Sequence, residues 1–413
     1  MISSLEMLSN KRARFLALSI ACLGVSFLIE NASEFIDAHS YCYEAGAGPF
    51  MTVSYYYHRL TRLGNPHLRN IFTRVIRITP QSGDGNVIHS PCDARRLHAR
   101  LLLVLANSVR PPAVIVLDYT YRTDTCAPDK PESIALRDAL VQATQRVPVV
   151  IGLSDLSHSD LPDNVREKSL PHPLTPAEGV LDPQQWRPMP ESDRLRYGLV
   201  RLHCDLELIP LAWSTYMDLK LTTCKDLPTI TQMAATAYDS RAISEELAAR
   251  SQKGQNALIT LLPEIRGYDA RDVLGGGQAV LDDLAAHIVI VCDFEGDMID
   301  SPSGPLPGGV FHANYIESVL TNSFTWPAPR IWVLLASFLW FVVIEILFEK
   351  LAHSPLKAAL YSVFASAAFL VVLYWVIVRL FNYYILAWPP SAAFLIGKTW
   401  SAVQARALEA RTN

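Results

Sequence analysis

The chain has 413 residues, of which 50% are hydrophobic and only 18% are charged, whereas soluble domains carry nearer a quarter of charged residues. Its mean hydropathy is +0.18. This much apolar material excludes disorder as the main state, and 36 Lys and Arg against 40 Asp and Glu disfavour a nucleic-acid partner.

The first predicted element is the charge-free apolar window Phe15–Ile29. It is shorter than the roughly 20 residues that a membrane helix usually needs, but the basic residues Lys11, Arg12 and Arg14 can extend their charged ends to the membrane surface. We interpret the window as an uncleaved anchor, and a cleaved signal sequence is the alternative. Residues 1–30 are therefore expected to form a cytoplasmic stub and a first membrane helix.

Residues 31–329 are predicted to form one domain of alternating strands and helices. Its first half contains a β-branched strand, a helix with Asp93 as its N-cap, a continuous apolar strand, a second helix and a second apolar strand. These are Thr73–Ile78, Asp93–Ala106, Ala113–Leu117, Ser133–Gln145 and Val147–Leu153. Continuous apolar strands are typical of sheets buried on both faces. The spacing predicts an α/β fold with a parallel or mixed sheet flanked by helices.

A Pro-rich insertion interrupts this pattern at residues 154–197, which contain seven prolines. The pattern resumes at Tyr197–Leu202. Helices are then expected at Pro228–Tyr238, Val280–Ala286 and Ala313–Leu320, with strands at Ala257–Leu262 and His287–Val291.

Three further charge-free windows follow the domain, at Ile331–Ile344, Ala358–Val378 and Leu380–Gly397. We expect three membrane helices within residues 330–400, the last beginning near Pro389 after a short interfacial turn, because proline fits the first turn of a helix. A re-entrant segment is the alternative for this last window. Together with the first window this gives about four membrane helices and a short tail at 401–413.

The charge distribution predicts the orientation of these helices. Residues 31–329 carry 26 basic and 35 acidic residues, a balance of −9, and the remainder carries 10 and 5, a balance of +5. Basic residues mark the cytoplasmic side of a membrane protein. We therefore expect a multi-pass protein of the bacterial inner membrane with its main domain in the periplasm or outside the cell.

The segment HIVIVCDFEGDMIDSPSGPLPGGVFHANYIESVL at 287–320 resembles the type 2 CHASE domain, an extracellular sensory module that is followed by three membrane helices. The residues that carry the resemblance are Asp293, Asp300, Pro302, Gly304, Pro307, Gly309, Val310, His312, Ala313 and Asn314. Further matches are Leu102–Gly152, the segment GYDARDVLGGG at 267–277, and Trp388-Pro389-Pro390. The resemblance implies a sensory domain, here without the fused output domain that is typical of the family.

Polar residues follow the predicted strands, where open α/β sheets bind ligands. Asp118, Asp293, Asp300, His312 and Asn314 are our candidate ligand-binding residues. The alternative for His312 and Asn314 is hydrogen bonding of loop backbone at the start of a helix. Asp293, Glu295, Asp297 and Asp300 put four acids in eight residues, but a solvated turn is favoured over Ca²⁺ binding. We expect no metal, no cofactor and no catalytic residue.

Six cysteines lie in the predicted outside domain: Cys42, Cys92, Cys126, Cys204, Cys224 and Cys292. An even number in an oxidising compartment predicts up to three disulfides. The first choice is Cys204–Cys224, and Cys126–Cys292 is the second because both follow predicted strands. Cys42 and Cys92 would then remain, and free buried thiols are the alternative.

These features favour a membrane-anchored sensor or accessory protein that relays a ligand or partner signal to a separate membrane or cytoplasmic protein. The expected cytoplasmic segments are too short for a catalytic domain, so the partner would supply the output. A homodimer and contacts with membrane lipids are also expected. The alternative is a structural scaffold subunit of a larger membrane complex.

Overall fold

The computed structural model describes the greater part of residues 71–335 and one short piece beyond. The described residues are 71–79, 90–154, 184–200, 209–210, 229–252, 256–257, 265–299, 306–324, 326–327, 329, 331–332, 335 and 383–384. The chain divides into two compact units, one of residues 64–324 and the other of residues 1–63 with 325–413. The sheet and the candidate site both belong to residues 64–324.

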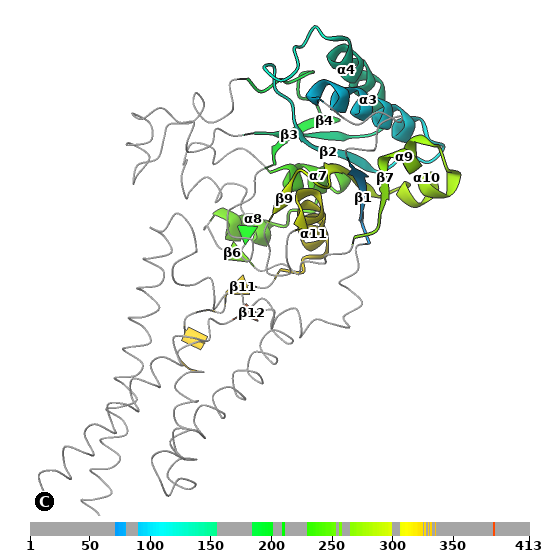
Figure 1. Ribbon diagram of the computed structural model, residues 1–413. Coiled ribbons are helices and arrows are strands. Elements are labelled where there is room, and N and C mark those ends of the chain that lie inside the picture. Colours follow the sequence, from blue (N-terminus) through cyan, green and yellow to red (C-terminus); the bar gives the residue numbers. More distant parts are fainter. Residues whose placement is uncertain are drawn as a thin grey trace, which may run out of the picture. The chain divides into compact units, whose positions relative to one another are not determined.

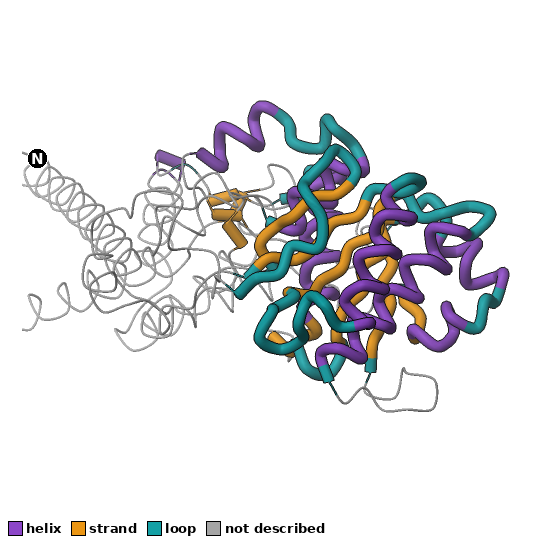
Figure 2. The backbone as a smooth tube through the Cα atoms, turned by 90° about the horizontal axis from the view of Figure 1, so that it is seen from above, coloured by secondary structure: helices purple, strands orange, loops and turns teal. Residues whose placement is uncertain are grey.

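A six-stranded, wholly parallel sheet forms the centre of this unit (Figure 1). Its order is β4-β3-β2-β8-β1-β7. The strands are β1 (Thr73–Ile78), β2 (Val114–Thr120), β3 (Val149–Leu153), β4 (Leu195–Leu199), β7 (Gly267–Asp269) and β8 (Ile288–Asp293). Figure 2 shows them lying side by side. The last of them in the chain, β8, lies between the first two and pairs with both.

Helices cover both faces of the sheet (Figure 1). One face carries α3 (Pro91–Asn107), α4 (Pro131–Thr144), α9 (Ala270–Leu274) and α10 (Gln278–Leu284). The other carries α7 (Ile230–Tyr238) and α11 (Gly308–Thr321). The helix α8 spans Glu245–Gln252. Helices on both faces explain the continuous apolar strands, because neither face of the sheet meets water.

Alternate residues of β2 show how one strand serves two core layers. Ile115 and Leu117 pack toward α3 and α4, whereas Val114 and Val116 pack toward α7 and α11. All four side chains are fully buried. The period-two alternation of a strand therefore also assigns Asp118, the next residue after Leu117, to the face of α7 and α11.

The neighbouring strands β2 and β8 are followed by helices on opposite faces of the sheet. After β2 the chain enters α4, and after β8 it enters α11, which packs on the other face. Such a divergence at the carboxyl edge of a parallel sheet is the position at which α/β folds most often bind ligands. It directs attention to the last residues of β2 and β8 and to the first turn of α11.

Short strand pairs complete the described structure. β5 (Ile209–Pro210) pairs with β6 (Asn256–Ala257), and β9 (Met298–Ile299) pairs with β10 (Leu306–Pro307), both antiparallel. In the other unit, β11 (Trp326–Pro327) pairs in parallel with β12 (Tyr383–Tyr384).

Most of the predicted elements are confirmed, with differences at their ends. The predicted cap Asp93 is wrong: Ser90 is the N-cap of α3 and accepts a hydrogen bond from the Asp93 N–H at 3.2 Å. Pro91 follows Ser90 at the position that proline favours in a helix. β4 begins at Leu195, inside the range predicted as an insertion, of which residues 155–183 lie outside the described part.

The strand β7 is an element that periodicity did not predict. Its three residues are too few for a recognisable alternation, and they belong to the sheet because Gly267 and the next two residues pair with β1.

Among the described residues, no helix has the length and apolar character required to cross a membrane. The predicted spans lie almost wholly outside those residues. Ile331, Trp332 and Leu335, at the start of the second predicted span, are described and are exposed.

Candidate functional site at the carboxyl edge of the sheet

Asp118 and His312 form a buried pair between β2 and α11. Asp118 follows four apolar residues of β2, and the pairing of β2 with β3 becomes irregular between Leu117 and Thr120. His312 lies in the second turn of α11. Its Nε2 is 3.5 Å from Asp118 Oδ1, and each side chain is only 2% exposed. The pair therefore joins the strand and the helix on either side of the divergence.

The imidazole of His312 is held at both ring nitrogens. Besides Nε2 near Asp118, its Nδ1 lies 3.1 Å from the hydroxyl of Thr231 at the start of α7. Burial lowers the pKa of His312 to about 4, although the nearby negative charge of Asp297 acts in the opposite direction. The ring is consequently neutral at neutral pH.

The carboxyl of Asp118 is incompletely satisfied. Its Oδ2 is buried and has no hydrogen-bond partner among the described residues. Burial raises the pKa of Asp118 to about 7, because a desolvated carboxylate favours its neutral form. Asp118 therefore changes charge near neutral pH, unlike an exposed carboxyl.

The first turn of α11 lies directly against this carboxyl and against Cys292. A Cβ atom added at Gly309 would overlap Cys292 and would stand 3.5 Å from Asp118 Oδ2. Only glycine allows so close an approach of the helix backbone to the sheet. The contact explains why a Gly-Gly pair opens α11, and it leaves Asp118 enclosed by protein.

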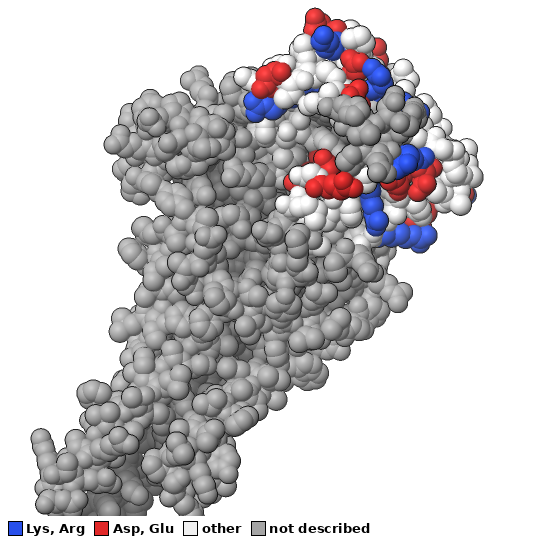
Figure 3. Space-filling view, in the orientation of Figure 1, with Lys and Arg blue, Asp and Glu red and all other residues white. Residues whose placement is uncertain are grey.

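Two further acids lie in the turn after β8. Asp293 Oδ1 accepts hydrogen bonds from the N–H groups of Glu295 and Gly296 at 3.1 and 2.8 Å, which closes the turn. The carbonyl of Asp297 accepts from the Gly308 N–H at 2.8 Å, and its carboxyl lies against Gly308. Figure 3 shows acidic side chains gathered on the visible face where Figure 1 places β9 and the start of α11.

The pKa of Asp297 is raised, first by burial and then by the negative charges of Asp118 and Asp293, whereas His312 lowers it. These groups thus sense one another electrostatically. The cluster of Asp118, Asp293, Asp297 and His312 is named the edge cluster below.

Arg77 is the nearby cation on the same face of the sheet. It pairs in register with Cys292 across β1 and β8, and its guanidinium lies 4.8 Å from the centre of the Phe294 ring. The Arg77 Nε is buried and, among the described residues, has no hydrogen-bond partner. Arg77 lowers the pKa of Cys292, but burial and the neighbouring acids raise it further, so Cys292 stays a neutral thiol.

The predicted ligand-binding residues have different outcomes. Asp118 and His312 are brought together, and Asp293 lies beside them in the turn. Asn314 is buried, and its Nδ2 donates to the carbonyl of Val310 in the preceding turn of α11 at 2.8 Å, which is helix backbone rather than the loop backbone expected in the alternative. Asp300 lies outside the described residues.

Sequence reasoning missed Thr231 and Arg77. No local signal marks either residue, since Thr231 reaches His312 from α7, 81 residues away. Arg77 lies near the edge cluster only because β8 inserts beside β1.

No group of three or more His, Cys, Asp or Glu side chains is placed to hold a metal ion within the part of the chain that the structure describes. The acidic loop considered for Ca²⁺ includes Asp300, so it lies partly outside that part.

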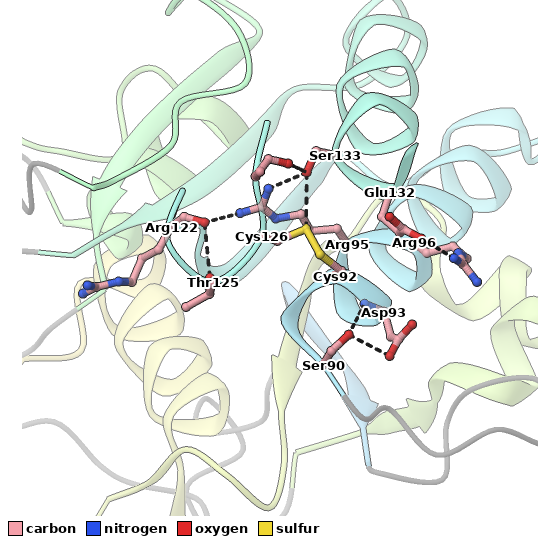
Figure 4. Close-up of a disulfide and its surroundings, with 11 residues drawn as sticks. Ser90, Cys92, Asp93, Arg95, Arg96, Arg122, Thr125, Cys126, Glu132 and Ser133 are labelled. Atoms are coloured by element: carbon pink, nitrogen blue, oxygen red, sulfur yellow. Dashed lines mark hydrogen bonds and ion pairs between the residues drawn. A yellow bond between two sulfur atoms is a disulfide. The ribbon is translucent and has the colours of Figure 1, made fainter. Parts of the chain in front are cut away.

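The predicted Cys126–Cys292 disulfide is wrong. Cys126 is bonded to Cys92, with their Cα atoms 5.3 Å apart (Figure 4), and Cys292 is a free, buried thiol. Cys292 points to the face of α7 and α11, whereas Cys92 and Cys126 lie with α3 and α4 on the other face. The sheet therefore separates the two predicted partners. Cys42, Cys204 and Cys224 lie outside the described residues.

A buried arginine supports the disulfide loop (Figure 4). Arg95 Nη1 donates to Ser133 Oγ at 2.6 Å and Nη2 donates to the Arg122 carbonyl. Its guanidinium stacks 4.4 Å from the centre of the Trp186 ring. With its hydrogen bonds made within the protein, this side chain fixes the connection between β2 and α4 rather than presenting charge to a ligand.

A family model for the CHASE2 domain matches residues 52–347. Comparison with curated proteins found no match, and comparison with solved structures found none either. The matched range covers most of the chain and contains the two strands, the turn and the helix that carry the edge cluster. The chain therefore belongs to the CHASE2 family of extracellular sensory domains.

Proposed function

We propose that this protein is a membrane-anchored extracytoplasmic sensor that relays a signal to a separate protein. The observation that carries the proposal is the buried, incompletely satisfied Asp118–His312 pair at the divergence of β2 and β8. Buried polar groups in natural proteins are rarely left without a hydrogen bond, and such a group calls for an explanation other than a gain in stability. The sensory character of the family supports the same interpretation.

The position of α11 supports a relay. It carries His312 near its beginning and ends at Thr321, only ten residues before the apolar window Ile331–Ile344. Exposed Ile331, Trp332 and Leu335 would be covered by lipid in an anchored protein. A shift of α11 would thus act on the chain that enters the membrane.

The Cys92–Cys126 disulfide supports a location outside the cytoplasm, because disulfides persist in oxidising compartments. We propose the periplasmic side of a bacterial inner membrane. We also propose that the chain is not itself an enzyme and that a partner protein supplies the output.

The test combines recovery of the partner with its activity. The tagged full chain would be purified in mild detergent, co-purifying proteins identified, and the output of the partner measured with wild type, Asp118→Ala and His312→Ala. We expect the partner to stay bound to all three proteins and its output to differ in the variants. Exposed Asp138→Ala is the matched control.

Two results would refute the sensor. One is a chain that retains no partner under any condition. The other is a set of folded variants that lose thermal stability and leave the output unchanged, which would instead support a structural scaffold.

A further inference from the structure

The contents of the edge cluster restrict what its ligand can be. The unpartnered Oδ2 of Asp118 is enclosed by β2, by Cys292 on β8 and by the first turn of α11, which approaches so closely that no Cβ fits at Gly309. An organic ligand would have to displace the helix before it reached this oxygen. A proton needs no such space.

We infer that the Asp118–His312 pair is a proton-binding switch and that acidification is the signal it reports through α11. This inference rests on the proposed function, to which it adds the identity of the stimulus.

The charges around the pair decide the direction of the switch. The groups that face the pair are Cys292 and Asp293 from β8, Asp297 from the following turn, Arg77 from β1 and the neutral hydroxyl of Thr231 from α7. Tyr119, next to Asp118 on β2, lies on the other face of the sheet against His98. Among these described groups the carboxyls outnumber the guanidinium of Arg77, which lies across Cys292 from Asp118. When Asp118 ionises, its charge is therefore added to a site that is already negative.

In the protonated state the first turn of α11 packs against the sheet, and we call this the closed state. With the proton bound, both Asp118 and His312 are neutral, and the first turn of α11 can rest on Cys292. Above neutral pH the Asp118 carboxylate is charged, because its pKa is about 7, and no hydrogen bond from a described residue stabilises Oδ2. A buried, unpaired charge is costly and draws in water.

The first turn of α11 is the element that can yield. The other walls around Asp118 are central strands, each paired on both sides. Among the described residues, the first turn of α11 makes one backbone hydrogen bond outside the helix, from Gly308 to Asp297, and it follows the short β9–β10 pair. Its N-cap Pro307 makes no side-chain capping bond. The far end is fixed more firmly, since Glu317 Oε1 accepts from the N–H groups of Phe72 and Thr73 at 2.7 Å each. Loss of the proton therefore loosens the beginning of α11 about a fixed end.

Hydrogen–deuterium exchange tests this directly. The full chain in detergent micelles would be exchanged between pH 5.5 and 8.5, with labelling times corrected for the intrinsic pH dependence of exchange, and peptides covering Gly308–Thr321 would be followed. We expect protection of the first turns to fall several-fold as the pH rises through about 7 in the wild type. Asp118→Asn cannot ionise, so α11 should keep its acid-state protection throughout.

Two further variants complete the experiment. Asp138→Asn, at an exposed position on α4, should keep the wild-type transition. Asp297→Asn should move its midpoint to lower pH, because removal of a neighbouring negative charge makes Asp118 easier to ionise. By its whole-residue area Asp297 lies at the surface, although its carboxyl is partly enclosed against Gly308, so this variant keeps the test decisive even if Asp118→Asn does not fold.

The proton assignment is overturned if α11 protection is independent of pH in the wild type, if Asp118→Asn retains the transition, or if Asp297→Asn leaves its midpoint unchanged. Should the partner's output still respond to the Asp118 and His312 variants, the sensor function stands and only the stimulus is wrong. An output that ignores those variants refutes the proposed function itself.

Discussion

Breaking the Cys92–Cys126 disulfide is expected to cost about 4 kcal/mol of unfolding free energy. The bridge ties the first turn of α3 to the connection between β2 and α4, across a sequence separation of 34 residues. In the chain-entropy relation, closing a loop of this length in the unfolded chain is worth about 4 kcal/mol at 25 °C. For a unit of this size, 1 kcal/mol shifts Tm by roughly 2–4 °C, so Tm should fall by about 8–16 °C.

Thermal denaturation of the full chain in detergent measures this loss. Cys92→Ala, Cys126→Ala and the double variant should all lose the same amount, because either substitution alone opens the bridge. Reduction of the wild type should approach the same Tm. Cys292→Ala is the control: it removes one buried sulfur, and we expect a loss of about 1 kcal/mol.

The alternative pairing gives a different pattern. If Cys292→Ala lowered Tm as much as Cys126→Ala while Cys92→Ala had no effect, Cys126 would be bonded to Cys292. Small, equal losses in all three variants would mean that no bridge forms. Either pattern contradicts the separation of these cysteines by the sheet.

Three other predictions test the packing and charge around α11. Glu317→Ala should lower the unfolding free energy by about 3 kcal/mol in chemical denaturation, because the buried N–H of Thr73 and the part-buried N–H of Phe72 lose their acceptor. A loss below about 1 kcal/mol would show that this end is not fixed. Gly309→Ala should cost about 1–3 kcal/mol, with only partial recovery in combination with Cys292→Ala, since the new Cβ overlaps the Cβ of residue 292 as well as its sulfur. The pKa of Asp118 is raised to about 7 and that of His312 is lowered to about 4. Between pH 4 and 6.5 folding therefore takes up a proton at Asp118 and releases one at His312. The two contributions to the pH dependence of stability cancel in the wild type. In His312→Gln only the contribution of Asp118 remains, so the stability of this variant relative to wild type should fall by about 1 kcal/mol per pH unit as pH rises through this window. Asp118→Asn should show the opposite slope in the same titration of Tm. Parallel curves for all three proteins would contradict the assigned pKa shifts.

Local patterns were sufficient to identify most elements of the sheet and its helices. The predicted strand at Thr73–Ile78 has the bounds that the structure gives to β1, and the apolar runs before Asp118 and Asp293 are the central strands β2 and β8. These strands are easy to recognise in the sequence because helices cover both faces of the sheet, so every residue in the run is apolar. A three-residue edge strand such as β7 has no such pattern to detect.

The candidate site was predictable in part, for a similar reason. A residue that follows an apolar strand in a parallel sheet lies at the carboxyl edge, so Asp118 and Asp293 could be assigned there without coordinates. His312 was found because the family pattern includes it. The unpaired oxygen of Asp118 and the contact of Gly309 with Cys292 depend on how closely a helix approaches the sheet, which no local pattern encodes.

The sequence by itself predicted an α/β domain within residues 31–329 that resembles the CHASE2 family, because apolar periodicity and the ordered motifs are local properties of the chain. Only the tertiary structure decided that β8 inserts between β1 and β2 and that Cys126 bonds Cys92 rather than Cys292. Period-two alternation assigns a side chain to one of two faces relative to its neighbours in the strand. The order of the strands follows from packing between segments far apart in the chain. The same packing decides that Cys126 and Cys292 lie on opposite faces of the sheet.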